Sequence, residues 1–241
     1  MAKVSKAGLN GAIGPVVFYT MNGKSYARAT PGTQSIKHKK KLQPQRSFFG
    51  RISSLSSKMA DAVRTELNCP FGLYAYNALR GWVFGQYKKN EGQASLQLNI
   101  IPSGLCELNA AAGLQQSLTA GVSLADKGDG NLSVSIASFN PAKDIKAPAG
   151  AAWINLKLIC ARAIRESGAL LHFELSLAQK LLHISNENIP SFEMELNSQG
   201  GKGDLVCLVL ALEFRTGEHS GGIINSPSFL PAAGIALGNL G

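Results

Sequence analysis

Two strand-like runs near the start of the chain flank an Asn-Gly pair. The runs are IGPVVFY at 13–19 and KSYARA at 24–29, and TMNG lies between them. Asn-Gly between strand-like runs is a strong local signal for a tight hairpin turn. The pattern predicts a β-hairpin over residues 15–29, with Pro15 at a strand start or on an edge because proline has no N–H to donate. An isolated hairpin is marginally stable in water, so this one needs a surface on which to dock.

A helical period begins at about residue 46. Apolar residues recur at spacings of three or four, at Phe48, Ile52, Leu55, Met59 and Val63. This spacing predicts an amphipathic helix that ends near Asn68, before Pro70. The preceding residues 30–45 are polar and rich in lysine, and we expect them to form an exposed basic connection.

The stretch FGLYAYNALRGWVFGQYKK at 71–89 predicts a second helix, with Tyr74, Ala78 and Trp82 on one side. Gly81 and Gly85 lie inside it. A glycine in a helix interior costs roughly 1 kcal/mol, so this pair indicates close packing or a break in the helix.

From about residue 93 the pattern is that of β-strands. Apolar and polar residues alternate in LSVSIASF at 132–139 and FEMELN at 192–197. Further strand-like runs lie at 94–100, 103–108, 117–125, 151–164, 169–178 and 204–216, with turn residues between them. The fold class predicted is mainly β (α+β). An antiparallel β-sandwich of the immunoglobulin or fibronectin kind over 93–241 follows an N-terminal arm (1–45) and a helical segment (46–92).

The net charge of +9 is unevenly distributed along the 241 residues. Residues 1–95 contain fifteen Lys or Arg and three acidic residues, giving +12, and the remainder contains nine and twelve, giving −3. This asymmetry is typical of a basic arm for nucleic acid or membrane phosphates. It is equally typical of a self-assembling protein whose basic end meets the acidic body of the next copy.

The cysteines and the N-terminus limit the candidate environments. Cys69, Cys106, Cys160 and Cys207 lie dozens of residues apart without zinc-ligand spacing, so we expect buried thiols and no metal site. No signal peptide is evident, and no run approaches the ~20 apolar residues that a membrane helix needs. We therefore expect a cytoplasmic protein, or one released as part of an assembled particle.

The order of several motifs resembles that of an uncharacterised bacterial family common in the Bacteroidota, a domain of unknown function. The motifs are VVFY…NGKSYAR, QPQRSFFG, LNIIPSGL, SIASFNPAKDIKAPAGA and LVLALEF. The specific N-terminal positions are Gly11, Gly14, Val17, Tyr19, Gly23, Tyr26, Arg28, Pro31, Gln45 and Arg46. Family members usually have a threonine and several glutamines where this chain has KHKKKLQPQ. The resemblance implies no enzymatic activity.

The residues suited to catalysis or ligation form no complete motif. Gly8, Gly11 and Gly14 do not follow a strand and open a helix, and no Gly-Lys-Ser/Thr sequence follows them at the spacing of a phosphate loop, so we favour close backbone approach over a nucleotide loop. His172 and His183 lack converging partners for a metal. Glu193 and Glu195 share the polar side of one strand, which disfavours a catalytic pair. We expect no enzymatic activity, no cofactor and no small-molecule substrate.

The sequence favours a non-enzymatic structural protein, a homo-oligomer or polymer such as a filament, tube or phage-like particle subunit. Its N-terminal hairpin would dock on a neighbouring subunit by strand addition. The assembly residues predicted are Gly11, Gly14, Val17, Phe18, Tyr19, Asn22, Gly23, Tyr26 and Arg28. The alternative is a nucleic-acid-associated protein whose phosphate contacts are Lys37, Lys39, Lys40, Lys41 and Arg46.

Overall fold

A computed structural model describes residues 3–5, 8–21, 24–29, 36–67, 73–89, 105–128, 130–165, 171–198, 204–218, 222–224 and 230–240. The chain divides into two compact units, an N-terminal unit (Met1–Phe48) and a body (Phe49–Gly241). The fold is mainly β, and all the pairings between its named strands are antiparallel. The predicted strand at 94–100 and Cys69 lie outside the described residues.

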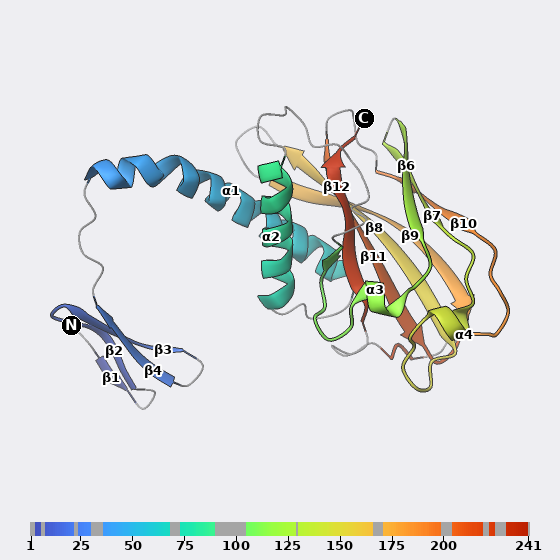
Figure 1. Ribbon diagram of the computed structural model, residues 1–241, viewed down its shortest axis with the longest axis horizontal. Coiled ribbons are helices and arrows are strands. Elements are labelled where there is room, and N and C mark those ends of the chain that lie inside the picture. Colours follow the sequence, from blue (N-terminus) through green and yellow to red (C-terminus); the bar gives the residue numbers. More distant parts are fainter. Residues whose placement is uncertain are drawn as a thin grey trace. The chain divides into compact units, whose positions relative to one another are not determined.

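The N-terminal unit contains a four-stranded sheet of consecutive strands (Figure 1). The strands are β1 (Lys3–Ser5), β2 (Gly8–Ile13), β3 (Val16–Met21) and β4 (Lys24–Ala29), in the order β1-β2-β3-β4. Strands β3 and β4 pair from Val16↔Ala29 to Met21↔Lys24, on either side of residues 22–23. The sequence pattern missed β1 and β2, because their glycines and polar residues give no apolar alternation.

The first helix, α1 (Ile36–Leu67), begins ten residues before the predicted start. Residues 36–45 are therefore helical rather than an exposed connection. Pro44 lies inside this helix and cannot donate a backbone hydrogen bond. A proline normally argues against a helix interior, which explains why the sequence pattern did not predict a helix here. The expected apolar face is present in the body, where Ile52, Met59 and Val63 are buried.

The second helix, α2 (Leu73–Lys89), continues unbroken through Gly81 and Gly85. Its buried face is Ala75, Leu79 and Val83, one position along from the face predicted. Tyr74 is 50% exposed instead. No atom of the described chain outside the local helix lies within 4 Å of a Cβ added at Gly81 or Gly85, so close packing does not explain these two glycines.

Two antiparallel sheets form the rest of the body (Figure 1). The five-stranded sheet has the order β5-β12-β11-β8-β9, with β5 (Cys106–Glu107), β12 (Ala232–Asn239), β11 (Leu205–Arg215), β8 (Trp153–Arg165) and β9 (Leu171–His183). The three-stranded sheet has the order β10-β7-β6, with β10 (Phe192–Asn197), β7 (Asn131–Ile136) and β6 (Val122–Gly128). Short helices α3 (Leu114–Ser117) and α4 (Pro141–Asp144) complete the described elements.

Both sheets contribute to one hydrophobic core. From β7 and β10 it includes Leu132, Val134, Ile136, Met194 and Leu196, and from β8 and β11 it includes Ile154, Leu156, Leu158, Leu208, Leu210, Leu212 and Phe214. The intervening residues of β8 and β11, such as Ile159, Val209 and Ala211, are also buried. These two strands are therefore buried on both faces, which explains their nearly continuous apolar sequence.

Strand β12 was not predicted, although it pairs with both β11 and β5 inside the sheet. Its sequence, AAGIALGN, consists mainly of small residues with low β-propensity. Small side chains suit this position because α2 packs closely here. A Cβ on Gly234 would lie 2.9 Å from Cζ3 of Trp82.

Candidate functional site

The two faces of the N-terminal sheet differ in chemistry. Strand alternation and register place Ile13, Val16, Phe18, Ala27 and Ala29 on one face, which we call the apolar face. Val16 pairs with Ile13 and Ala29, and Phe18 pairs with Ala27. None of these five side chains carries a charge or a polar group, whereas Thr20 and Ser25 continue the same face toward the β3–β4 connection.

The apolar face is not buried within the described chain. Of the sheet residues whose exposure the structure describes, 11–20 and 24–29, none is buried. Ile13 is 54% exposed, and every residue of β4 is exposed. A sheet normally becomes stable by burying one face. Among its described residues, the N-terminal unit by itself buries neither face of this sheet.

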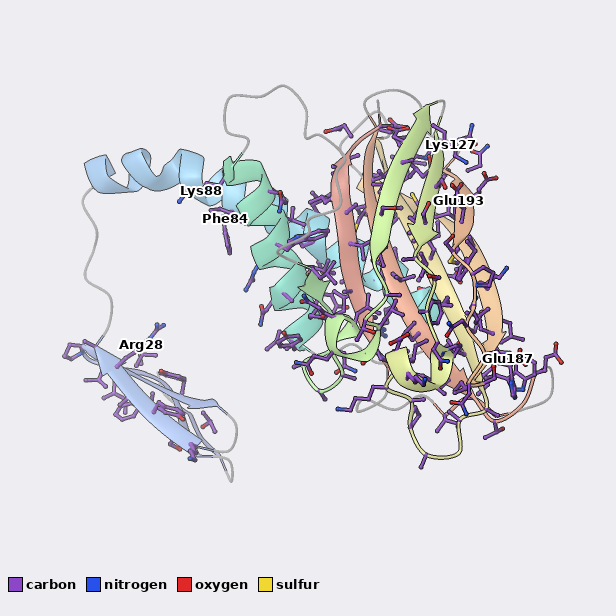
Figure 2. All side chains as sticks on the ribbon, turned by 45° about the vertical axis from the view of Figure 1, so that its right-hand side comes forward. Arg28, Phe84, Lys88, Lys127, Glu187 and Glu193 are labelled. Carbon is purple, nitrogen blue, oxygen red and sulfur yellow. The ribbon has the colours of Figure 1, made fainter. Side chains whose placement is uncertain are left out.

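The opposite face carries aromatic and basic side chains. The rings of Tyr19 and Tyr26 stack at 5.5 Å between centroids with an interplanar angle of 19°, and the Arg28 guanidinium lies 5.7 Å from the Tyr19 centroid. Figure 2 labels Arg28 on this sheet. The two tyrosines are 37% and 39% exposed. Arg28 and the two rings form a short stack at the protein surface.

The predicted assembly residues fall on one sheet but on both of its faces. Phe18 belongs to the apolar face, whereas Val17, Tyr19, Tyr26 and Arg28 lie on the opposite one. Asn22 and Gly23 lie outside the described residues. Ile13, Val16, Ala27 and Ala29, which share the face of Phe18, are not among the predicted assembly residues. Their shared face follows from the strand alternation once β2 is known to pair with β3.

Gly11 and Gly14 have conformational roles. Gly14 has a φ of +57° in the turn between β2 and β3, and Gly11 has a φ of +123° in β2. We expected Gly14 to allow close backbone approach, but no atom of the described chain lies within 4 Å of a Cβ added there. Residues with a side chain rarely adopt these positive φ values, which favours glycine at both positions.

The basic residues proposed for phosphate contacts, Lys37, Lys39, Lys40, Lys41 and Arg46, all lie on α1. Their side chains are outside the described part of the chain. Nine of the 24 Lys and Arg residues, and none of the 15 acidic residues, lie in residues 1–48. That stretch therefore carries +9, and the remaining fifteen basic and fifteen acidic residues sum to zero. All of the net charge belongs to the N-terminal unit.

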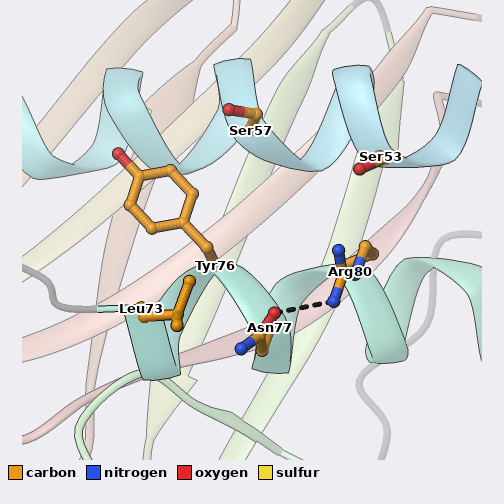
Figure 3. Close-up of a pocket in the computed structure, with 6 residues that line it drawn as sticks. All are labelled: Ser53, Ser57, Leu73, Tyr76, Asn77 and Arg80. Carbon is orange, nitrogen blue, oxygen red and sulfur yellow. Dashed lines mark hydrogen bonds between the residues drawn. The ribbon is translucent and has the colours of Figure 1, made fainter. Parts of the chain in front are cut away.

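A groove lies between α1 and α2 in the body (Figure 3). It has a volume of about 230 Å³ and is lined by Ser53, Ser57, Leu73, Tyr76, Asn77 and Arg80. Arg80 donates to Asn77 Oδ1 at 2.7 Å and lies 5.5 Å from the Phe49 ring centroid. The groove is smaller than the roughly 300–1,000 Å³ of typical ligand pockets, and its only cation already has partners.

A buried polar cluster lies on the side of the five-stranded sheet that faces the helices. Lys157 Nζ lies 2.7 Å from Glu213 Oε2 and donates to the Glu66 carbonyl of α1 at 3.3 Å. Arg215 contacts Glu213 Oε1 at 2.6 Å. Burial by itself would raise the pKa of Glu213, but hydrogen bonds from Lys157 and Arg215 lower it overall. The cluster ties the end of α1 to the sheet.

The other polar candidates have structural partners. The His183 ring packs edge-on against Trp153 at 4.9 Å, and the side chain of His172 is outside the described part. Lys127 bridges Glu193 and Glu195 at 3.1 and 2.7 Å on an exposed surface (Figure 2 labels Lys127 and Glu193). Hydrogen bonds from Ser133 and Lys127 lower the pKa of Glu193, which suits an ion pair better than a general acid.

Three cysteines, Cys106, Cys160 and Cys207, are free and buried, as the sequence predicted. Burial raises the pKa of Cys106 and of Cys160 to about 12. Among the residues that the structure describes, no three His, Cys, Asp or Glu side chains gather into a metal-binding group. Within the same residues, neither long helix is apolar enough to cross a bilayer.

Comparison with known proteins gives no match to a family model, a curated protein or a solved structure. The apolar face of the N-terminal sheet is therefore the feature from which a function is best argued.

Proposed function

We propose that the protein is a non-enzymatic structural protein that self-assembles, and that its N-terminal sheet binds a neighbouring copy. The observation that carries this proposal is the apolar face of Ile13, Val16, Phe18, Ala27 and Ala29, none of which is buried. Complete burial of a Val, Ile or Phe side chain is worth about 1.5–3 kcal/mol each. Docking of this face would supply stability that the sheet lacks by itself.

Unlike surfaces on one chain give head-to-tail assembly. Such contacts produce a ring when the rotation closes and an open filament or tube when it does not. The body would be the repeating unit, and we propose for it an immunoglobulin- or fibronectin-like β-sandwich. Its two antiparallel sheets with a shared core support this. A filament, tube or phage-like particle subunit fits this organisation.

Mass measurement of the assembled protein tests this function. Light scattering and sedimentation velocity would compare the full chain with one lacking residues 1–32, and electron microscopy would look for regular polymers. Phe18→Asp places a charge on the apolar face and should prevent assembly. Ala12→Asp, on the opposite face and on β2 rather than beside β4, is the matched control and should preserve it. A full-length protein that stays monomeric at high concentration would refute the proposal.

The alternative is a nucleic-acid-associated protein. It is favoured by the exposed stack of Arg28, Tyr19 and Tyr26 within a stretch that carries +9. Single-stranded nucleic acids stack their bases on such rings and neutralise their phosphates with basic side chains. Binding to a single-stranded oligonucleotide should weaken steeply with salt, and should be lost when Lys37, Lys39, Lys40 and Lys41 are changed to Gln. Absence of binding at low salt would exclude this alternative.

A further inference from the structure

Two strands with matching chemistry lie at sheet edges in different units. In the described chain β4 pairs only with β3, and β9 pairs only with β8. Strand β9 is 13 residues long, the same length as its partner. A long edge strand offers unpaired backbone groups to any other strand, and proteins usually cover or protect it.

Strand β9 carries an apolar stripe on the face of the sheet that is turned toward the helices. Phe173, Leu175 and Leu177 pair with Ala163, Ala161 and Ile159 of β8, and all lie on the same face as Lys157, which reaches α1. Leu177 is 37% exposed, and Phe173 and Leu175 are partly buried. The stripe can therefore bury more apolar surface than it does in the single chain.

The other face of β9 is acidic at the same end. Arg162 lies 3.0 Å from Asp204 Oδ2 and also bonds Glu174 of β9. Two carboxylates thus contact one guanidinium. The Glu174 side chain is 49% exposed, whereas that of Arg162 is 15% exposed. The Glu174 carboxylate at this end of β9 is therefore accessible to a cation of another chain.

Strand β4 has the complementary alternation. Ala27 and Ala29 belong to the apolar face, and Lys24, Tyr26 and Arg28 lie on the other. An antiparallel pairing with Arg28 opposite Glu174 would place Ala27 opposite Leu175, and Ser25 opposite Leu177. The uncharged residues of the two strands then share one face. On the other face Arg28 meets Glu174, and Lys24 lies opposite Ala178, with Lys180 two residues further along β9.

The remaining edges of the body fit β4 less well. Strand β5 is only two residues long. On β10, Met194 and Leu196 are already buried, so an added strand would gain little apolar contact. On β6, Val122 and Leu124 already pack against the core, so an added strand would gain less apolar contact there. Charge complementarity of the kind between β4 and β9 selects among otherwise similar partners.

We infer that β4 of one copy adds to β9 of a second copy and joins its four-stranded sheet to the five-stranded sheet of that copy. This inference rests on the proposed self-assembly and names the acceptor surface. Each copy presents one donor and one acceptor strand, so the contact repeats head to tail. The backbone pairing supplies affinity, and the alternating faces set the register.

Disulfide trapping between separately prepared chains tests this pairing. Chains carrying Ala27→Cys are mixed with chains carrying Leu175→Cys and oxidised gently, and mass spectrometry of peptides identifies the linked positions. Directly opposed residues have Cβ atoms about 4.5–5.5 Å apart, close to the range that a disulfide spans. The pair Ser25→Cys with Leu177→Cys tests the same register if Leu175→Cys folds poorly. Gln116→Cys, at an exposed position on α3, is the matched control acceptor.

A link between positions 27 and 175, or between 25 and 177, should form at least about tenfold faster than links to position 116. One outcome is that the wild-type chain assembles and loses assembly without residues 1–32, but the disulfides at 27–175 and 25–177 form no faster than those to position 116. Strand addition at β9 would then be wrong while self-assembly stands. A monomeric wild-type chain would overturn both. Because only links between different chains are scored, docking within one chain would give no preferred link and would also overturn the inference.

Discussion

The Trp82 indole of α2 lies directly over Gly234 of β12, in the space that a side chain at that position would occupy. A Cβ added there would lie 2.9 Å from Cζ3 of Trp82, 3.1 Å from Cη2 and 3.2 Å from the Cβ of Cys106. The glycine thus allows the helix to approach the sheet. Without it, the ring or the strand would have to move.

Gly234→Ala should therefore destabilise the body. Overpacking of a filled site typically costs about 1–3 kcal/mol, and urea denaturation followed by tryptophan fluorescence would measure the loss. Gly222→Ala is a suitable control because the space around its Cβ is open. Equal stability of Gly234→Ala and the wild type would show that Trp82 does not pack as described.

Replacing a glycine of α2 with alanine should raise the stability of the body rather than lower it. Gly81→Ala adds a methyl group into open space and raises helix propensity, so we expect about 0.5–1 kcal/mol of added stability. The same denaturation experiment measures it. A clear loss of stability would indicate that another surface covers α2 at this position.

The buried carboxylate of Glu213 should matter far more than an exposed one. Glu213→Gln breaks the contacts with Lys157 and Arg215 at a residue that is 1% exposed. Breaking a buried pair typically costs about 3–5 kcal/mol. Glu195→Gln, which removes an exposed contact with Lys127, should change the unfolding free energy far less, because solvent screens an exposed ion pair. Similar losses in both variants would contradict this.

The same carboxylate predicts acid sensitivity. The pKa of Glu213 in the folded state lies below its ordinary value of 4.5. Its contribution to stability is therefore complete above pH 4.5 and is lost as the pH falls through the lowered pKa. Denaturation curves collected across this range should show a smaller decline in stability for Glu213→Gln than for the wild type. Parallel curves would argue against a charged Glu213 in the folded protein.

The buried thiols should be inert in the folded protein. A free cysteine with a pKa of about 8.5 is partly ionised at about pH 8, but Cys106 and Cys160 have pKa values of about 12. Burial also raises the pKa of Cys207. Iodoacetamide at about pH 8 should leave all three unmodified by peptide mass spectrometry until guanidinium unfolds the chain. Rapid modification without denaturant would show that the core opens locally.

Much of the β architecture follows from local pattern. The alternation in 132–139 and 192–197 predicted two strands, which form β7 and β10, and the apolar runs at 151–164 and 204–216 became β8 and β11. The spacing of Ile52, Met59 and Val63 predicted the buried face of α1. Periodicity identifies such elements because each side chain's direction depends only on the local backbone.

The errors occur where contacts distant in sequence decide the outcome. In β12, Gly234 is required where Trp82 of α2 packs on the sheet, and no local pattern reports that contact. The buried face of α2 consists of Ala75, Leu79 and Val83, whereas Tyr74 is exposed. Which face of the helix is buried depends on where the helix packs, and the helix sequence does not report that.

For the candidate site, too, local sequence predicted one part and contacts distant in sequence decided the other. The sequence by itself determined that residues 1–48 carry all of the net charge and that strand-like runs flank Asn22-Gly23. Only the tertiary structure decided that β2 joins these strands, that Phe18 and Tyr19 face opposite sides, and that β9 lies at a sheet edge. Charge and periodicity are properties of single residues and short segments. Exposure of a face or an edge depends on which distant strands pair, so it exists only in the folded chain.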